Sequence, residues 1–189
     1  MWQGQNVLEA KTIDMDRTGK KMTANGDVFS FLVEQGKDPL RVTADHLVYT
    51  DEDRHSRYER NVVLRSQDMV MTAAVVDAWL LAADQVQAGQ SRMERAVATG
   101  KVRLDQPRRA AEGAKKAVPE RHGSAERAEY TQADDTLVLS GGNPIVIDEM
   151  RGATTGRELT YHIADDRISV VGDVNLRTLT EHRVVKKSR

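Results

Sequence analysis

The chain has 189 residues, of which 39% are hydrophobic and 30% are charged, and its net charge is −1. These values are typical of one domain of moderate size or of one elongated repeat array. The small net charge does not favour nucleic acid and no RNA- or DNA-binding motif is present, so we expect no nucleic-acid partner. Cysteine is absent, which excludes disulfides, thiolate metal sites and a cysteine nucleophile.

Aromatic side chains are scarce, with 2 Trp, 4 Tyr and 2 Phe. A compact globule of this length normally uses more of them, whereas an open body of two sheets with a thin interior needs fewer. No apolar run approaches the roughly 20 residues that a membrane span requires. The N-terminus is polar, so we expect no signal peptide in this sequence. A sequence pattern that recurs along the chain, described below, first appears close to the N-terminus, near Ala10. We therefore expect the chain to be part of a longer protein.

Residues 8–33 are predicted to form a β-hairpin. Its first arm covers residues 8–15, its turn residues 16–20 and its second arm residues 23–33. The turn contains a glycine, which can take a positive φ. Residues 35–39, which contain Gly and Pro, follow the hairpin and are expected to interrupt the strand.

Residues 40–50 form the clearest predicted strand. Val42 and Ala44 lie on one face by the two-residue period of a strand. Leu47 and Tyr49 are out of phase with them, which predicts a bend or bulge inside the strand. A polar turn and a returning strand follow.

Residues 69–81 repeat the pattern of the strand predicted at residues 40–50. The run from residue 73 to 81 is rich enough in Ala, Val and Leu to be read as helix, but its alignment with residues 44–52 favours a strand. Residues 82–95 hold an insertion that resembles a longer hairpin tip, and residues 93–104 bring the chain back.

Residues 106–124 contain two Pro and two Gly and little apolar content, which predicts a mobile loop. The loop is not a domain boundary, because the recurring strand pattern continues at Ala125. The last unit covers residues 155–177, and the basic tail 181–189 is expected to be frayed. Residues 1–189 are therefore predicted to form a single domain.

One sequence pattern recurs about five times along the chain. Each unit has a first extended run, a polar turn and a second extended run that usually begins with Gly-x-Val. The separation between equivalent positions is 13 residues in three units, 14 in one, and 24 in the unit with the insertion. In that order, the spacings join Met15 to Val28, Tyr49 to Val62, Tyr161 to Val174, Tyr130 to Pro144, and Ala78 to Val102. Generic hairpin periodicity is the alternative explanation. Without a capped amphipathic helix, these short units predict an all-β fold of stacked units or two facing sheets.

The pattern Ala-Asp-x-Leu-x-Tyr followed by Gly-x-Val-x-Leu resembles the OstA-like/LptA family of lipopolysaccharide-transport proteins over about residues 8–177. The residues that carry the resemblance are Ala44, Asp45, Leu47, Tyr49, Val62 and Leu64, then Gly100, Val102 and Leu104, then Leu159, Tyr161, Gly172, Val174 and Leu176. The resemblance implies a V-shaped antiparallel β-jellyroll of two sheets with an apolar interior and a periplasmic location. It also implies that lipopolysaccharide or a similar lipid is carried, and that the domain stacks by its edge strands on itself or on other OstA-like domains, such as those of LptC or LptD.

Three features depart from the family pattern. The insertion in the third unit and the loop 106–124 are longer than the repeat needs, and Pro144 stands where the other units have Val. Proline cannot donate to a β-ladder.

A groove for acyl chains needs a row of inward apolar side chains that stays partly unfilled. The candidates are Ile13, Val28, Val42, Leu47, Tyr49, Val62, Leu64, Val76, Val102, Leu104, Tyr130, Tyr161, Val174 and Leu176. For any one of them, a place in an ordinary sandwich core is the alternative. The end units, residues 8–33 and 155–177, are the expected edges, where unpaired backbone groups can accept another strand.

Other chemistry has little support in the sequence. The five His are scattered without ligand spacing, and the acidic clusters at 51–53, 134–135 and 165–166 fall in turns, where Asp is favoured for turn geometry. No phosphate-binding Gly loop or Ser nucleophile motif is present. We therefore expect no metal, no cofactor and no enzymatic activity. A lipid-free β-repeat scaffold and a polysaccharide-active enzyme are the alternative functions.

Overall fold

The protein is described by a computed structural model over residues 2–3, 6–33, 38–81, 92–107, 120–165, 167–172 and 179–181. Within these ranges the regular structure consists of fifteen strands, all paired antiparallel, and no helix that could span a membrane is found. The strands are β1 (Trp2–Gln3), β2 (Asn6–Glu9), β3 (Thr12–Asp16), β4 (Lys21–Leu32), β5 (Leu40–Thr50), β6 (His55–Arg65), β7 (Val70–Leu80), β8 (Met93–Gln106), β9 (Arg121–Thr131), β10 (Thr136–Ser140), β11 (Ile145–Asp148), β12 (Gly152–Thr155), β13 (Glu158–His162), β14 (Arg167–Val171) and β15 (Leu179–Glu181).

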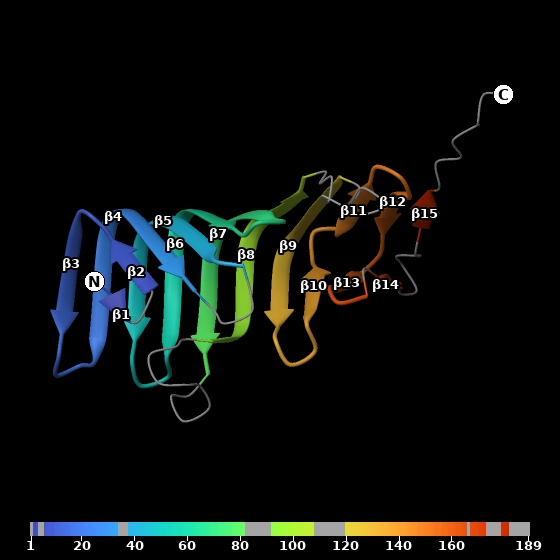
Figure 1. Cartoon of the computed structure of the whole chain (residues 1–189). Helices are drawn as coiled ribbons and strands as arrows, with labels where there is room; N and C mark the ends of the chain where they lie inside the picture. The colour runs from blue at the N-terminus through green and yellow to red at the C-terminus, as the bar shows by residue number, and fades with distance from the viewer. Residues whose placement is uncertain are drawn as a thin grey trace.

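Six long strands, β4 to β9, lie side by side in chain order (Figure 1). Each of their five pairings has a shift of register near the middle of the strands. The shifts divide every long strand into two halves, so one set of strands supplies both layers. We call the layers sheet 1, with strand halves 21–25, 46–50, 55–59, 75–79, 95–99 and 127–131, and sheet 2, with halves 28–32, 40–44, 62–65, 70–73, 102–106 and 121–125.

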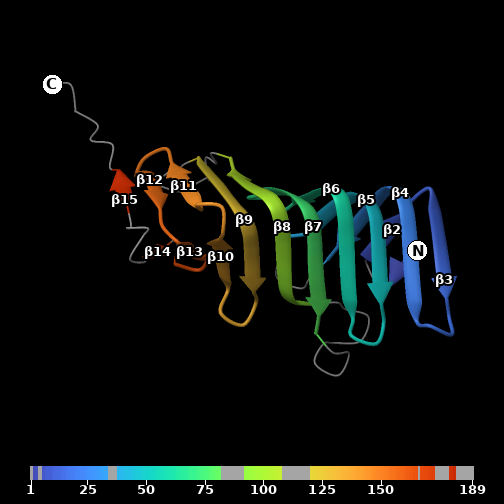
Figure 2. The same cartoon turned by 180° about the vertical axis from the view of Figure 1, so that it is seen from behind.

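Short strands extend the two sheets separately at both ends. Beyond β9, sheet 1 continues through β10, β13 and β14, whereas sheet 2 continues through β11, β12 and β15 (Figure 2). At the other end, β3 pairs with the first half of β4, and β2 with its second half. The predicted all-β antiparallel fold of two sheets is thus confirmed, and the run that begins at residue 73 is strand, as expected, up to Leu80.

The first predicted arm needs a correction. Residues 8–15 do not form one strand, because the chain leaves sheet 2 after β2 and enters sheet 1 at β3. The crossing lies at Ala10 and Lys11, where the Lys11 amide donates to the carbonyl of Gly26 at 2.9 Å. The bend predicted between Ala44 and Leu47 is confirmed, since the β5–β6 register shifts between Thr43 and His46.

The Gly-x-Val motif is the corner between the sheets. In four units the two residues before the buried side chain both have positive φ. These pairs are Gly26–Asp27, Arg60–Asn61, Gly100–Lys101 and Gly142–Asn143, and they precede Val28, Val62, Val102 and Pro144, which are all fully buried. Two consecutive left-handed residues turn the chain sharply and aim the third side chain inward. Pro144 fits this place because it precedes β11 and is not part of the ladder.

Several predicted segments lie outside the described residues. They are most of the insertion (82–91), most of the loop (108–119), residues 173–178 with Val174 and Leu176, and the tail from 182. Strands β8 and β9 run to Gln106 and from Arg121, so the connection between them is shorter at both ends than the predicted loop.

Replacing Gly100 by Ala tests the corner motif. Gly100 has a φ of +81°, and an added Cβ would lie 2.8 Å from the Cβ of Ala74. Left-handed strain and crowding together should lower the free energy of unfolding by about 2 to 4 kcal/mol, measured by urea denaturation. The double variant Gly100→Ala/Ala74→Gly should regain the part due to crowding. Gly141→Ala, whose nearest neighbour would be the Cβ of Glu126 at 3.3 Å, should cost less, and equal losses would contradict the corner model.

Candidate functional site

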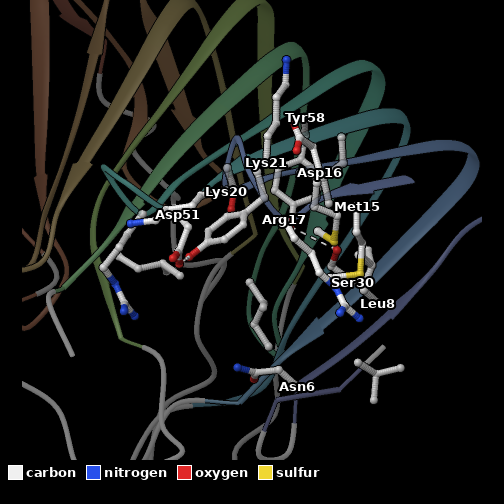
Figure 3. Close-up of a pocket in the computed structure, with 18 residues that line it drawn as sticks. Asn6, Leu8, Met15, Asp16, Arg17, Lys20, Lys21, Ser30, Asp51 and Tyr58 are labelled. Atoms are coloured by element: carbon white, nitrogen blue, oxygen red, sulfur yellow. Dashed lines mark hydrogen bonds between the residues drawn. The ribbon is translucent and has the colours of Figure 1, made fainter. Parts of the chain in front are cut away.

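A cavity of about 410 Å³ lies between the two sheets near their N-terminal end (Figure 3). Its volume falls within the range of small-molecule sites, roughly 300 to 1,000 Å³. Sheet 2 contributes β2 and the second half of β4, and sheet 1 contributes β3 to β7. The apolar and aromatic side chains of its wall are Val7, Leu8, Met15, Met22, Leu32, Leu47, Tyr49, Tyr58 and Leu80.

One side of the cavity is charged, because the hairpin turns of sheet 1 end there. The β3–β4 turn contributes Asp16, Arg17 and Lys20, and the β5–β6 turn contributes Asp51 and Arg54. The turns are joined by a hydrogen bond from the Asp51 amide to the carbonyl of Lys20, at 2.9 Å. In Figure 3 the labelled charged side chains gather on the side of the cavity opposite Asn6 of β2.

Two tyrosines fix polar contacts in the wall. The Tyr58 hydroxyl on sheet 1 donates to Oγ of Ser30 on sheet 2 at 3.1 Å, so this buried hydrogen bond spans the interior. Burial raises the pKa of Tyr58, although the bond to Ser30 opposes the rise. The Tyr49 hydroxyl donates to Asp51 at 3.2 Å, and burial together with the charge of Asp51 raises the pKa of Tyr49. Both hydroxyls are therefore protonated donors near neutral pH.

The interior is packed more tightly towards β9 and β10. A Cβ added at Gly123 of sheet 2 would lie 3.3 Å from the Leu104 Cβ and 3.4 Å from a Leu139 methyl group of sheet 1. The facing sheets are therefore in van der Waals contact here, and the missing side chain of Gly123 makes room for Leu139.

At the same end, a buried ion pair within sheet 2 is connected to sheet 1 by a hydrogen bond to Tyr161. Arg121 and Asp148 are register partners on sheet 2, only 5% and 4% exposed, and the Arg121 Nε donates to Asp148 Oδ2 at 2.7 Å. The Arg121 Nη1 also donates to the Tyr161 hydroxyl on sheet 1 at 3.2 Å, with its guanidinium 5.6 Å from the ring centre. The backbone amides of Met150 and Arg151 donate to Asp148 Oδ1, both at 2.8 Å. Burial alone would raise the pKa of Asp148, but these donors outweigh it and hold that pKa below its usual value.

The outer face of sheet 1 carries a charged network. Arg57 pairs with Glu59 and Asp77, and His55 contacts Asp77 at 2.7 Å while stacking on Trp79. These groups satisfy one another across β6 and β7. Among the described residues, no three His, Asp or Glu side chains are arranged to hold a metal ion.

The predicted groove residues occupy three kinds of place. Leu47 and Tyr49 line the cavity. Six others are buried in the core outside the cavity wall, namely Val28, Val42, Val62, Val76, Val102 and Leu104. Ile13, Leu64, Tyr130 and Tyr161 are partly buried against that core. Val174 and Leu176 lie outside the described residues.

Sequence reasoning missed much of the cavity wall and all of its charged side. Tyr58 and Leu80 follow the same two-residue alternation as the chosen residues and could have been found from it. Arg54 and Lys20 had no such signal, because they lie in turns, where charged residues are common.

Removing the Tyr58 hydroxyl tests the contact between the sheets. Tyr58→Phe leaves Ser30 unpaired inside the protein, so we expect a loss of about 1 kcal/mol in the free energy of unfolding, measured by urea denaturation. Tyr49→Phe removes an exposed hydrogen bond and serves as the control, with an expected change of less than about 0.5 kcal/mol. A larger loss in the control would contradict a special role for the Tyr58–Ser30 contact.

Comparisons with known proteins find one matching family model and a similar solved structure. The family model described as LptA/(LptD N-terminal domain) LPS transport protein matches residues 41–167, which is 167 − 41 + 1 = 127 of the 189 positions. A crystal structure of LptH from Pseudomonas aeruginosa is similar, with a TM-score of 0.59, 15% sequence identity, and coverage of 78% of this chain and 96% of that chain. Its title calls LptH the LptA homologous periplasmic component of the conserved lipopolysaccharide transport device. At this identity the likeness shows the fold alone, and a search of curated proteins finds no match.

Proposed function

The chain belongs to the family of lipopolysaccharide transport proteins formed by LptA and the N-terminal domain of LptD, and we propose that it is a periplasmic, lipid-binding module of this transport. In this proposal the interior shields acyl chains from water, and edge strands stack on neighbouring OstA-like domains to bridge the inner and outer membranes. The periplasmic location is carried over from LptH.

The cavity between the sheets is the observation that carries the lipid-binding part. Its wall is largely apolar, and each methylene removed from water contributes about 0.8 kcal/mol, so partial shielding of several methylenes is enough for binding. Nine of the 18 lining residues are apolar or aromatic, and this part of the wall would hold an acyl chain mainly by non-directional contacts, which suits a lipid that must be released again. Leu47 and Tyr49 are the sequence-derived groove candidates in this wall, and we keep the other candidates as proposed contacts along the same interior.

The free edges of sheet 1 support the stacking part. Within the described residues, β3 pairs only with β4 and β14 pairs only with β13, so each has an open side. Open edges can accept a further strand by backbone hydrogen bonding. The edges lie at opposite ends of the row of strands, which suits head-to-tail assembly (Figure 1).

Photocrosslinking tests lipid binding. A photoreactive phenylalanine analogue of similar size at Tyr49 should crosslink to lipopolysaccharide, because this side chain lines the cavity. The same analogue at Val48, one residue away and therefore on the opposite face of β5, is the control and should give little product. Equal crosslinking at both positions, or crosslinking only at Val48, would overturn the lipid-binding proposal and favour a lipid-free scaffold.

Disulfide trapping tests stacking, and the absence of cysteine makes it specific. Met15 on β3 and Val171 on β14 are 54% and 41% exposed. When equal amounts of Met15→Cys and Val171→Cys proteins are mixed under mild oxidation, we expect mixed dimers to exceed the half of all dimers that random pairing gives. A statistical mixture of the three species would contradict head-to-tail self-stacking.

A further inference from the structure

The charged side of the cavity contains cations without carboxylate partners. Arg17, Lys20, Lys21 and Arg54 contribute four positive charges, and Asp16 and Asp51 contribute two negative ones, which leaves 4 − 2 = +2. Within the described part of the chain, none of the four cations forms a salt bridge.

The two carboxylates are already engaged by groups of their own turns. Asp16 Oδ1 accepts hydrogen bonds from the amides of Thr18 and Gly19 at 3.0 and 2.9 Å, and Asp51 accepts one from Tyr49. Each Asp therefore stabilises a hairpin turn and does not neutralise the neighbouring cations by direct contact.

Arg54 adds an independent observation. It lines the cavity, and its Nε is buried without a hydrogen-bond partner among the described residues. A buried donor on a cation that forms no bond costs free energy, so such groups are usually satisfied by a ligand or water. Lys20 lines the same cavity, and its backbone carbonyl accepts a hydrogen bond from the Asp51 amide, which joins its turn to the turn that carries Arg54.

We propose that Arg54 and Lys20 bind the phosphate-bearing headgroup of an amphiphile whose acyl chain occupies the apolar part of the cavity. A phosphate monoester carries a charge of about −1.5 to −2 near neutral pH, which balances the net charge of +2 on the charged side of the cavity. A fatty-acid carboxylate carries only one negative charge. Guanidinium and ammonium donors are also the groups that proteins use for phosphate. This inference rests on the proposed lipid-binding function, and it adds which headgroup is bound and by which residues.

The test compares two ligands that share an acyl chain. Lysophosphatidic acid has a phosphate, and the corresponding monoacylglycerol has none. Both are titrated into the full chain below their critical micelle concentrations, with isothermal calorimetry as the readout. We expect Arg54→Gln to weaken lysophosphatidic acid binding about tenfold, equivalent to about 1.4 kcal/mol, and to leave monoacylglycerol binding unchanged. Raising the salt concentration should likewise weaken only the phosphate ligand.

Two further variants complete the design. Lys20→Asn changes an exposed turn residue with a φ of 49°, which Asn tolerates, so it tests the same site if Arg54→Gln fails to fold. Arg103→Gln removes an exposed cation of β8, outside the cavity wall, and should change neither affinity.

The possible outcomes separate the two proposals. If both ligands bind equally and neither Arg54→Gln nor Lys20→Asn has an effect, the headgroup inference is wrong while lipid binding stands. If neither ligand binds, the lipid-binding proposal fails as well. If inorganic phosphate binds as tightly as lysophosphatidic acid and Arg54→Gln weakens both equally, the charged side of the cavity is a site for free phosphate and the amphiphile inference is overturned.

Discussion

Asp148→Ala is expected to lower the free energy of unfolding by about 3 to 5 kcal/mol, because it removes the carboxylate that compensates the buried charge of Arg121. It also removes the acceptor for the amides of Met150 and Arg151. A loss of this size is a large part of the roughly 5 to 15 kcal/mol that stabilises a typical domain. Urea denaturation followed by circular dichroism measures it.

Two further variants separate charge from hydrogen bonding. Asp148→Asn keeps an oxygen acceptor but loses the charge, so its loss should be about half as large. The double variant Arg121→Met/Asp148→Leu removes both charges and should recover most of the stability, since a buried pair can often be replaced by apolar residues. A double variant as unstable as Asp148→Ala would show that this buried pair is not exchangeable for apolar packing.

The pH dependence gives an independent check with a defined sign. The pKa of Asp148 is lower in the folded protein than in the unfolded chain. The stabilisation is therefore complete above the unfolded pKa, about 3.9, and is lost as the pH falls through the folded pKa. Wild type should lose more stability than Asp148→Asn on acidification below about pH 4, and parallel losses would contradict the assignment.

Leu139→Ala and Leu47→Ala should differ in stability although the two leucines are almost equally buried, at 2% and 3% exposure. Leu139 packs against the opposite sheet near Gly123, so its truncation creates a new void and should cost about 3 to 5 kcal/mol. Leu47 already borders the cavity, so its truncation enlarges an existing space and should cost about 2 to 3 kcal/mol.

Ligand binding should show the opposite order. Leu47→Ala should weaken binding of a monoacylglycerol, because the acyl chain loses part of its wall, while Leu139→Ala should leave binding unchanged at temperatures where the variant is folded. Equal stability losses together with unchanged binding in both variants would indicate that the cavity is not used.

The interior changes along the row of strands. Near β2 to β7 the facing sheets enclose a cavity with a cationic side, and near β9 to β13 they are in contact and joined by Arg121, Asp148 and Tyr161. Under the proposed lipid-binding function, a lipid held in the cavity would meet the contact between Arg121 and Tyr161 further along the interior. For transport, this contact is the place where the interior would have to change.

The sequence by itself determined the fold class and the position of the bend in β5. Two-residue alternation shows which side chains share a face, and the break of phase between Ala44 and Leu47 marks the point where β5 passes from one sheet to the other. The 13-residue spacings from Met15 to Val28 and from Tyr49 to Val62 each run from a residue that lines the cavity to the buried residue at the corner of the next strand, whereas Val174 lies outside the described residues. These are local properties, so they are readable without the structure.

Only the tertiary structure decided which inward residues border open space. Leu47 and Val102 have the same pattern and similar burial, yet only Leu47 lines the cavity, because the distance between the sheets is set by all the side chains that meet there. The same holds for Arg121 and Asp148, 27 residues apart, and for Lys20 and Arg54 in separate turns. Their partners and surroundings depend on strand pairing and on the folding of one sheet over the other, which no local pattern records.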